Sequence, residues 1–266
     1  MSAASTNRSR PTCGLASNAM EGDYLRRGVA EFLGAFALTF FGAGAVMVGA
    51  GGLVGVALAY GLVYALMVTA FGHISGGHFN PATTLGFLVT RRIAAALAVV
   101  YWLMQLAGAC VAALLLWWIF PAEAISPARL GAPLLHPSIG SGAGFALEGI
   151  MTAFLVLAVF ATAVDERGAF RAVAGFGIGL VITIGALCGG PLTGAAMNPA
   201  RAFGPEVVYD VWESYTWIYY AGPAVGAIFA AVLYELLYLR PWPRPTPGGP
   251  AGTGVEEPGA GDLAAS

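Results

Sequence analysis

The chain has 266 residues, of which 58% are hydrophobic and only 10% are charged, and its mean hydropathy is +0.76. This composition departs from the roughly quarter-charged balance of soluble domains and predicts a membrane protein. The net charge of −2 offers no broad basic surface for nucleic acid.

The two ends of the chain differ in composition from the middle. Residues 1–25 lack a continuous apolar core, so we expect a disordered tail there and no cleaved signal peptide. Residues 241–266 are rich in proline and glycine and predict a second disordered tail. The membrane domain is therefore expected within residues 26–240.

Six apolar stretches in this domain are long enough to cross a hydrocarbon core of about 30 Å as helices. They lie at about residues 28–48, 53–72, 94–120, 143–164, 172–189 and 216–239. Two further apolar segments, residues 80–89 and 198–208, would each be about 15 Å long as helices. Each of these two segments is expected to reach only halfway across the membrane.

The arginines predict an orientation. If both ends of the chain are cytoplasmic, only Arg129 and Arg201 of the 12 arginines fall away from the inner side. This distribution follows the positive-inside rule.

The chain contains an internal repeat. The triplet Asn-Pro-Ala begins at Asn80 and again at Asn198, and the same offset relates Gly61 to Gly179 and Ser75-Gly76 to Thr193-Gly194. The copies occupy about residues 26–120 and 143–240, and each holds three full spans and one half span. Because three is odd, the second copy enters the membrane from the opposite side, which predicts an inverted repeat.

The triplets predict where the half helices begin. Asparagine is a strong N-cap, and proline suits the first helical position. Inverted symmetry then points both positive helix ends at the bilayer centre, beside the amides of Asn80 and Asn198. Two amide donors and two positive dipole ends suit a neutral oxygen and repel a cation, which indicates a channel that excludes protons and cations.

The sequence disfavours two other classes of function. A coupled secondary transporter also uses inverted repeats and broken helices, but its substrate site needs an ionisable group. An enzyme is disfavoured because the sequence has no nucleophile with its base and no phosphate-binding loop. The spacing of the cysteines and of His73 and His78 gives no metal site, so no metal or cofactor is expected.

Three stretches resemble the aquaporin, or major intrinsic protein, family. They are AEFLGAFALTFFG at 30–42, GHISGGHFNPATT at 72–84 and MNPARAFGP at 197–205, and the resemblance covers about residues 26–240. It implies an all-α membrane protein, with six transmembrane helices and two re-entrant half helices in a right-handed bundle. It also implies a homotetramer in the plasma membrane, or the inner membrane of a bacterium, with a pore in each subunit that passes water and small neutral solutes but not protons or ions.

The resemblance also implies roles for individual residues. The midplane donors would be Asn80 and Asn198, and the half helices would stack through Pro81, Ala82, Pro199 and Ala200. The selectivity filter would consist of Tyr60, Ala186, Ala195 and Arg201. The re-entrant loops would be supported by Glu31 and Glu148, and the inner vestibule would be shaped by His73 and His78.

The filter departs from both common patterns of the family. Water-selective members usually carry a histidine where Ala186 stands, and glycerol-conducting members typically have two filter aromatics and an aspartate where Ala202 stands. Alanine at 186 and 195 predicts a wider and less polar filter. The alternative function is therefore a facilitator mainly for uncharged solutes such as glycerol, urea, hydrogen peroxide and neutral metalloid acids.

Overall fold

The structure, a computed structural model, describes residues 13–167 and 173–240, and every regular element in these ranges is a helix. The long helices are α1 (Cys13–Met47), α2 (Gly52–Ser75), α4 (Ala95–Ile119), α6 (Ser141–Val159), α7 (Ala174–Thr193) and α9 (Ile218–Tyr234). Short π-helical turns, η2 (Phe160–Val164) and η4 (Glu235–Leu239), extend α6 and α9. The short helices are α3 (Pro81–Val89), α5 (Ala122–Ala128), η1 (Arg129–Gly131) and α8 (Pro199–Tyr209).

The prediction of six spans is confirmed, because six helices in the described residues are long and apolar enough to cross a membrane. The expected tail at 1–25 differs from the structure, in which α1 already begins at Cys13. The expected tail at 241–266 lies outside the described residues, as do residues 1–12.

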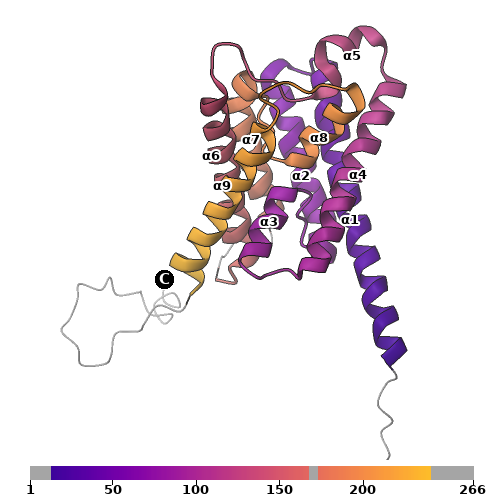
Figure 1. The fold of residues 1–266 in the computed structure, drawn as a ribbon, viewed down its shortest axis with the longest axis vertical. Helices are drawn as coiled ribbons and strands as arrows, with labels where there is room; N and C mark the ends of the chain where they lie inside the picture. Colours follow the sequence, from indigo (N-terminus) through magenta and orange to yellow (C-terminus); the bar gives the residue numbers. More distant parts are fainter. Residues whose placement is uncertain (1–12, 168–172, 241–266) are drawn as a thin grey trace, which may run out of the picture.

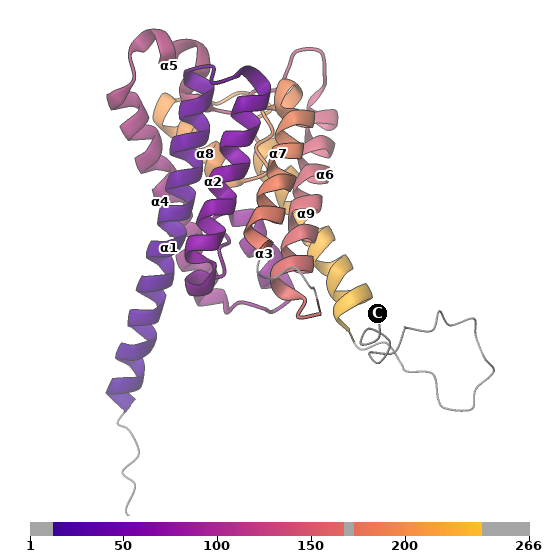
Figure 2. The ribbon, with the colours of Figure 1, turned by 180° about the vertical axis from the view of Figure 1, so that it is seen from behind.

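The two half helices enter the bundle from opposite ends and approach each other in its middle, as an inverted repeat requires (Figure 1). The long helices contact one another in matching pairs, since α1 packs on α4 in the first repeat and α6 packs on α9 in the second. Between the repeats, α2 packs on α7, which Figure 2 shows side by side.

Glycines allow these helices to approach to backbone contact. A Cβ on Gly61 of α2 would lie 2.5 Å from the carbonyl oxygen of Gly179 on α7, and a Cβ on Gly179 would lie 2.3 Å from that of Gly61. Lipid tails are as apolar as the outer surfaces of the helices, so the hydrophobic effect does little to bring the helices together. Close packing of small residues therefore has to stabilise the bundle.

The bundle has an apolar exterior and a partly polar interior. Large apolar side chains such as Leu66, Leu103 and Phe229 are more than half exposed on its outer surface, whereas Glu31 and Glu148 are fully buried. This distribution suits a hydrocarbon solvent, in which exposed polar groups are costly and buried ones serve function.

Both ends of the described chain lie at the same end of the bundle, where α1 begins and η4 finishes (Figure 1). An even number of full spans requires this arrangement. The opposite end carries α5 and the loop that leads to α6.

Candidate pore

The two half helices begin as the triplets predict. Asn80 is the N-cap of α3, and its Oδ1 accepts a hydrogen bond from the Ala82 N–H at 2.8 Å. Asn198 caps α8 in the same way, with the Ala200 N–H at 2.9 Å and the Arg201 N–H at 3.3 Å from its Oδ1. The proline after each asparagine lacks the N–H that would otherwise be unpaired in this first turn.

Each asparagine also binds the opposite half of the protein. Asn80 Nδ2 donates to the Met197 carbonyl at 2.8 Å, and Asn198 Nδ2 donates to the Phe79 carbonyl at 2.8 Å. An amide nitrogen carries two hydrogens, so one hydrogen of each asparagine remains for another acceptor. Because both ends of each amide are held, its orientation is fixed.

The loops that lead to the half helices follow the same backbone path. Phe79 and Met197, which precede the two asparagines, have positive φ angles of 46° and 51°, and Ala195 has a φ of 44°. Side chains other than glycine rarely adopt this left-handed conformation, and it persists only where the surroundings hold it in place. In this protein two buried glutamates hold it.

Glu31 on α1 accepts hydrogen bonds from the first loop. Its Oε1 is 3.0 Å from the His78 N–H and 2.6 Å from the Ser75 hydroxyl, and its Oε2 is 2.6 Å from the Phe79 N–H. A fourth donor, Gln105 Nε2 of α4, is 2.7 Å from Oε2. The loop therefore has an acceptor for the N–H groups that a continuous helix would have paired internally.

Glu148 on α6 repeats this arrangement in the second half. Its Oε1 accepts from the Ala196 N–H at 2.9 Å and the Thr193 hydroxyl at 2.7 Å, and its Oε2 accepts from the Met197 N–H at 2.7 Å.

The sequence analysis did not single out Gln105, which binds Glu31. The sequence does carry a signal for it, because it is a polar residue within an apolar span.

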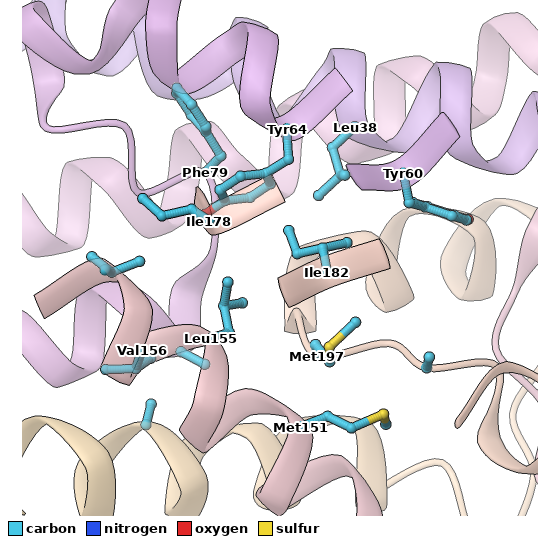
Figure 3. Close-up of a cluster of buried hydrophobic side chains, with 14 of the residues drawn as sticks. Leu38, Tyr60, Tyr64, Phe79, Met151, Leu155, Val156, Ile178, Ile182 and Met197 are labelled. Carbon is cyan, nitrogen blue, oxygen red and sulfur yellow. The ribbon is translucent and has the colours of Figure 1, made fainter. Parts of the chain in front are cut away.

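The four residues expected to form the filter, Tyr60, Ala186, Ala195 and Arg201, line one narrow cavity of about 20 Å³, which Asn80 and Asn198 also line. This volume is enough for one or two water molecules. The remaining wall is largely apolar and includes Leu38, Leu155, Ile182 and Met197. Figure 3 shows these side chains coming from different segments of the chain around Tyr60 and Tyr64.

Arg201 and Tyr60 supply polar atoms to the cavity. Arg201 is 5% exposed, its Nη2 donates to the Gly194 carbonyl at 3.2 Å, and its guanidinium carbon lies 4.9 Å from the centroid of the Tyr60 ring. Within the described chain, neither Arg201 Nη1 nor the Tyr60 hydroxyl has a hydrogen-bond partner, although both atoms are buried. Both are therefore buried polar atoms that the described residues leave without a partner.

A wider cavity of about 400 Å³ opens beside the end of α2, and His73 lines it. His78 does not line this cavity, because its ring is buried. Its Nδ1 lies 3.0 Å from the Thr84 hydroxyl, and its ring centroid lies 4.2 Å from the ring centroid of Phe87. Gly76 lines the cavity, and a Cβ there would lie 3.3 Å from His78 Nε2, so the His78 ring lies directly behind the cavity wall.

An ion pair ties the helix ends near this cavity. Arg167 donates from Nε and Nη2 to Asp165 at 2.9 and 2.7 Å, and Nη2 also donates to the Tyr238 carbonyl of η4 at 2.5 Å. Hydrogen bonding to Arg167 holds the pKa of the Asp165 carboxyl well below its usual range. The pair therefore stays charged at neutral pH.

The family model of the major intrinsic proteins matches residues 18–234. The chain belongs to the major intrinsic protein family, which includes the aquaporins. It is 43% identical over 211 residues to the lens fiber major intrinsic protein of Gallus gallus, with 78% of this chain and 79% of that protein covered. It is 40% identical to Aquaporin TIP4-4 of Zea mays, covering 83% of this chain and 91% of the relative.

The structure of the aquaglyceroporin from Plasmodium falciparum has the same fold, with a TM-score of 0.73 and 27% identity. The similarity covers 80% of this chain and 96% of that protein. This major intrinsic protein is therefore a passive membrane channel for water and small solutes.

The four hydrogen bonds to Glu31 give the first prediction. Glu31→Ala should destabilise the protein by about 3 kcal/mol or more, because it leaves several buried donors without an acceptor. Glu213→Ala, which removes an exposed ion pair with Arg129 at 3.2 Å, should cost about 1 kcal/mol or less. Thermal unfolding in detergent, followed by tryptophan fluorescence, measures both. Equal melting temperatures for the two variants would contradict the loop-supporting role.

Proposed function

We propose that this channel passes water in single file past Asn80 and Asn198, admits small neutral solutes, and excludes protons and other cations. The observation that carries the proposal is that each amide is fixed by an N–H of its own half helix and by a carbonyl of the opposite loop. The Nδ2 groups that Asn80 and Asn198 turn toward the pore are consequently hydrogen-bond donors.

A water molecule at this point can accept hydrogen bonds from both amides through its oxygen. Its own hydrogens then point away from the asparagines, toward the two mouths. The hydrogen bonds on the two sides of this water therefore run in opposite directions and do not form one continuous chain of donors. Proton transfer along a water file needs such a chain, so the fixed amides oppose it. The N-terminal ends of α3 and α8 add positive potential at the same place.

Arg201 provides a second barrier. It is a fixed positive charge on the wall of a cavity of about 20 Å³, so a cation would have to pass it with almost no water around it. A neutral solute meets no such repulsion and can instead accept a hydrogen bond from the guanidinium group of Arg201. We assign Tyr60, Ala186, Ala195 and Arg201 as the selectivity filter.

The alternative function is conduction mainly of uncharged solutes such as glycerol, urea, hydrogen peroxide and neutral metalloid acids. Two of the four residues assigned to the filter are alanines, which favours it, and so does the likeness to an aquaglyceroporin. The single aromatic ring of Tyr60 favours water as the main permeant, because it occupies part of the opening.

The oligomeric state of the channel, its membrane and its orientation are also proposals. We infer a homotetramer in the plasma membrane, or in the inner membrane of a bacterium, on the basis of the family. The arginines at the end of the bundle where the described chain begins and finishes, among them Arg26, Arg27 and Arg240, support cytoplasmic termini. We propose transport as its role, with no catalytic reaction.

Reconstitution into vesicles tests the main proposal. Stopped-flow light scattering should show faster water efflux from loaded vesicles than from empty ones, while a pH-sensitive dye inside reports no added proton flux. The same vesicles should be compared with glycerol, urea and hydrogen peroxide. Water efflux equal to that of empty vesicles, or a sizeable proton current, would refute water conduction with proton exclusion.

Arg201→Val should weaken the cation barrier, because only the helix dipoles and the amides then oppose a charge. Proton and sodium leakage per channel should rise above that of the parent, measured with ion-sensitive dyes under an imposed potential. Arg26→Gln, at a side chain that is 70% exposed in an ion pair with Asp23, is the matched control and should leave leakage unchanged. Unchanged leakage in folded Arg201→Val would show that the arginine is not a barrier.

Ala186→His should narrow the filter, because an imidazole would occupy space in the cavity that alanine leaves open. Passage of glycerol or urea should fall about tenfold or more, whereas water flow should stay within a few fold, since water is smaller and gains a polar contact. Both fluxes are measured at equal protein per vesicle. If solute passage is the same before and after the change, Ala186 does not set the solute range.

A further inference from the structure

One face of helix α1 carries a stripe of small and apolar residues. Gly34, Leu38 and Gly42 follow one another at intervals of four residues, which places them on one face of the helix. Leu38 lines the narrow cavity. The glycines on either side of it are each covered by an aromatic ring, Phe79 over Gly34 and Tyr60 over Gly42.

The ring of Tyr60 occupies the space that a side chain at position 42 would need. A Cβ on Gly42 would lie 2.0 Å from Cε1, 2.3 Å from Cδ1 and 2.5 Å from Cζ of Tyr60. Non-bonded carbon atoms normally stay about 3.5–4.0 Å apart. The ring can therefore rest against the backbone of α1 only because residue 42 is glycine.

The same ring also faces the pore. Its centroid lies 4.9 Å from the guanidinium carbon of Arg201, and both residues line the cavity of about 20 Å³. The Tyr60 hydroxyl and Arg201 Nη1 have no partner in the described residues. With α1 behind the ring, displacement away from α1 moves the ring into the opening.

We propose that Gly42 is a specificity-determining residue that acts through Tyr60. Without a Cβ, it lets the tyrosine ring withdraw against α1 and so sets the width of the opening between the ring and Arg201. Any larger residue at 42 moves the ring toward Arg201 and excludes larger solutes first. This inference rests on the proposed function of Tyr60 and Arg201 as parts of the filter.

The experiment compares two alanine substitutions on one helix. Gly42→Ala should lower the ratio of glycerol or urea permeability to water permeability about tenfold or more, because one methyl group in a close-fitting site discriminates strongly. Gly44→Ala is the matched control, since its Cβ would lie 3.6 Å from Leu116 Cδ2 and 4.0 Å from Phe120 Cζ, which are ordinary contacts. It should leave the ratio unchanged. All permeabilities are measured by stopped flow in vesicles at equal protein content.

A double-mutant cycle tests whether the effect passes through the ring. In the Tyr60→Val background there is no ring to displace, so adding Gly42→Ala should leave the solute-to-water ratio where Tyr60→Val alone puts it. A merely structural defect would instead lower both permeabilities by the same factor in both backgrounds. Thermal unfolding provides a second readout, in which Tyr60→Val should restore the melting temperature lost in Gly42→Ala.

An unchanged or increased solute-to-water ratio in Gly42→Ala, or a loss of melting temperature that Tyr60→Val does not restore, would overturn the inference. If the parent vesicles pass neither water nor solutes, the proposed function itself fails. That outcome is separate, because it is measured on the unsubstituted chain. A parent that conducts, with a Gly42→Ala variant that keeps its ratio, rejects only the role of Gly42.

Discussion

Two buried carboxylates hold the structure on which the pore depends. A chain that stops halfway across a bilayer leaves backbone N–H groups that water cannot reach and no helix pairs. Glu31 and Glu148 accept hydrogen bonds from these groups, two N–H donors each, and both side chains are fully buried. Removing a carboxylate would leave the desolvation cost of several donors at once. The presence of these two acidic side chains inside the bundle is thus explained by the loops that they hold.

The two loops are also tied to each other. Asn80 binds the carbonyl before Asn198, and Asn198 binds the carbonyl before Asn80, so neither half helix can shift without the other. The positive φ angles of Phe79 and Met197 place these carbonyls toward the opposite loop. Local strain, the buried glutamates and the crossed amide bonds thus act together. The result is a pair of donors with fixed direction at the start of two helix dipoles.

Small residues have two different roles in this structure, one in helix packing and one in the space around the narrow cavity. At Gly61 and Gly179 the absence of a side chain brings two helix backbones together and stabilises the bundle. At Gly42 the same absence makes room for the Tyr60 ring, while Ala186 and Ala195 leave space on the walls of the same narrow cavity. Small residues therefore border this cavity and the Tyr60 ring, and we propose that they set the width of the pore together with Arg201.

Sequence by itself determined the membrane class, the six spans, the inverted repeat and the start of each half helix, because hydropathy, span length and N-capping are local properties of the chain. The duplication of the triplets in register supplied the one long-range relation. Only the tertiary structure brought Gln105 to Glu31, the Tyr60 ring between Gly42 and Arg201, and each asparagine to the opposite loop. These contacts join residues 18 to 141 positions apart, and their distances depend on how whole helices pack.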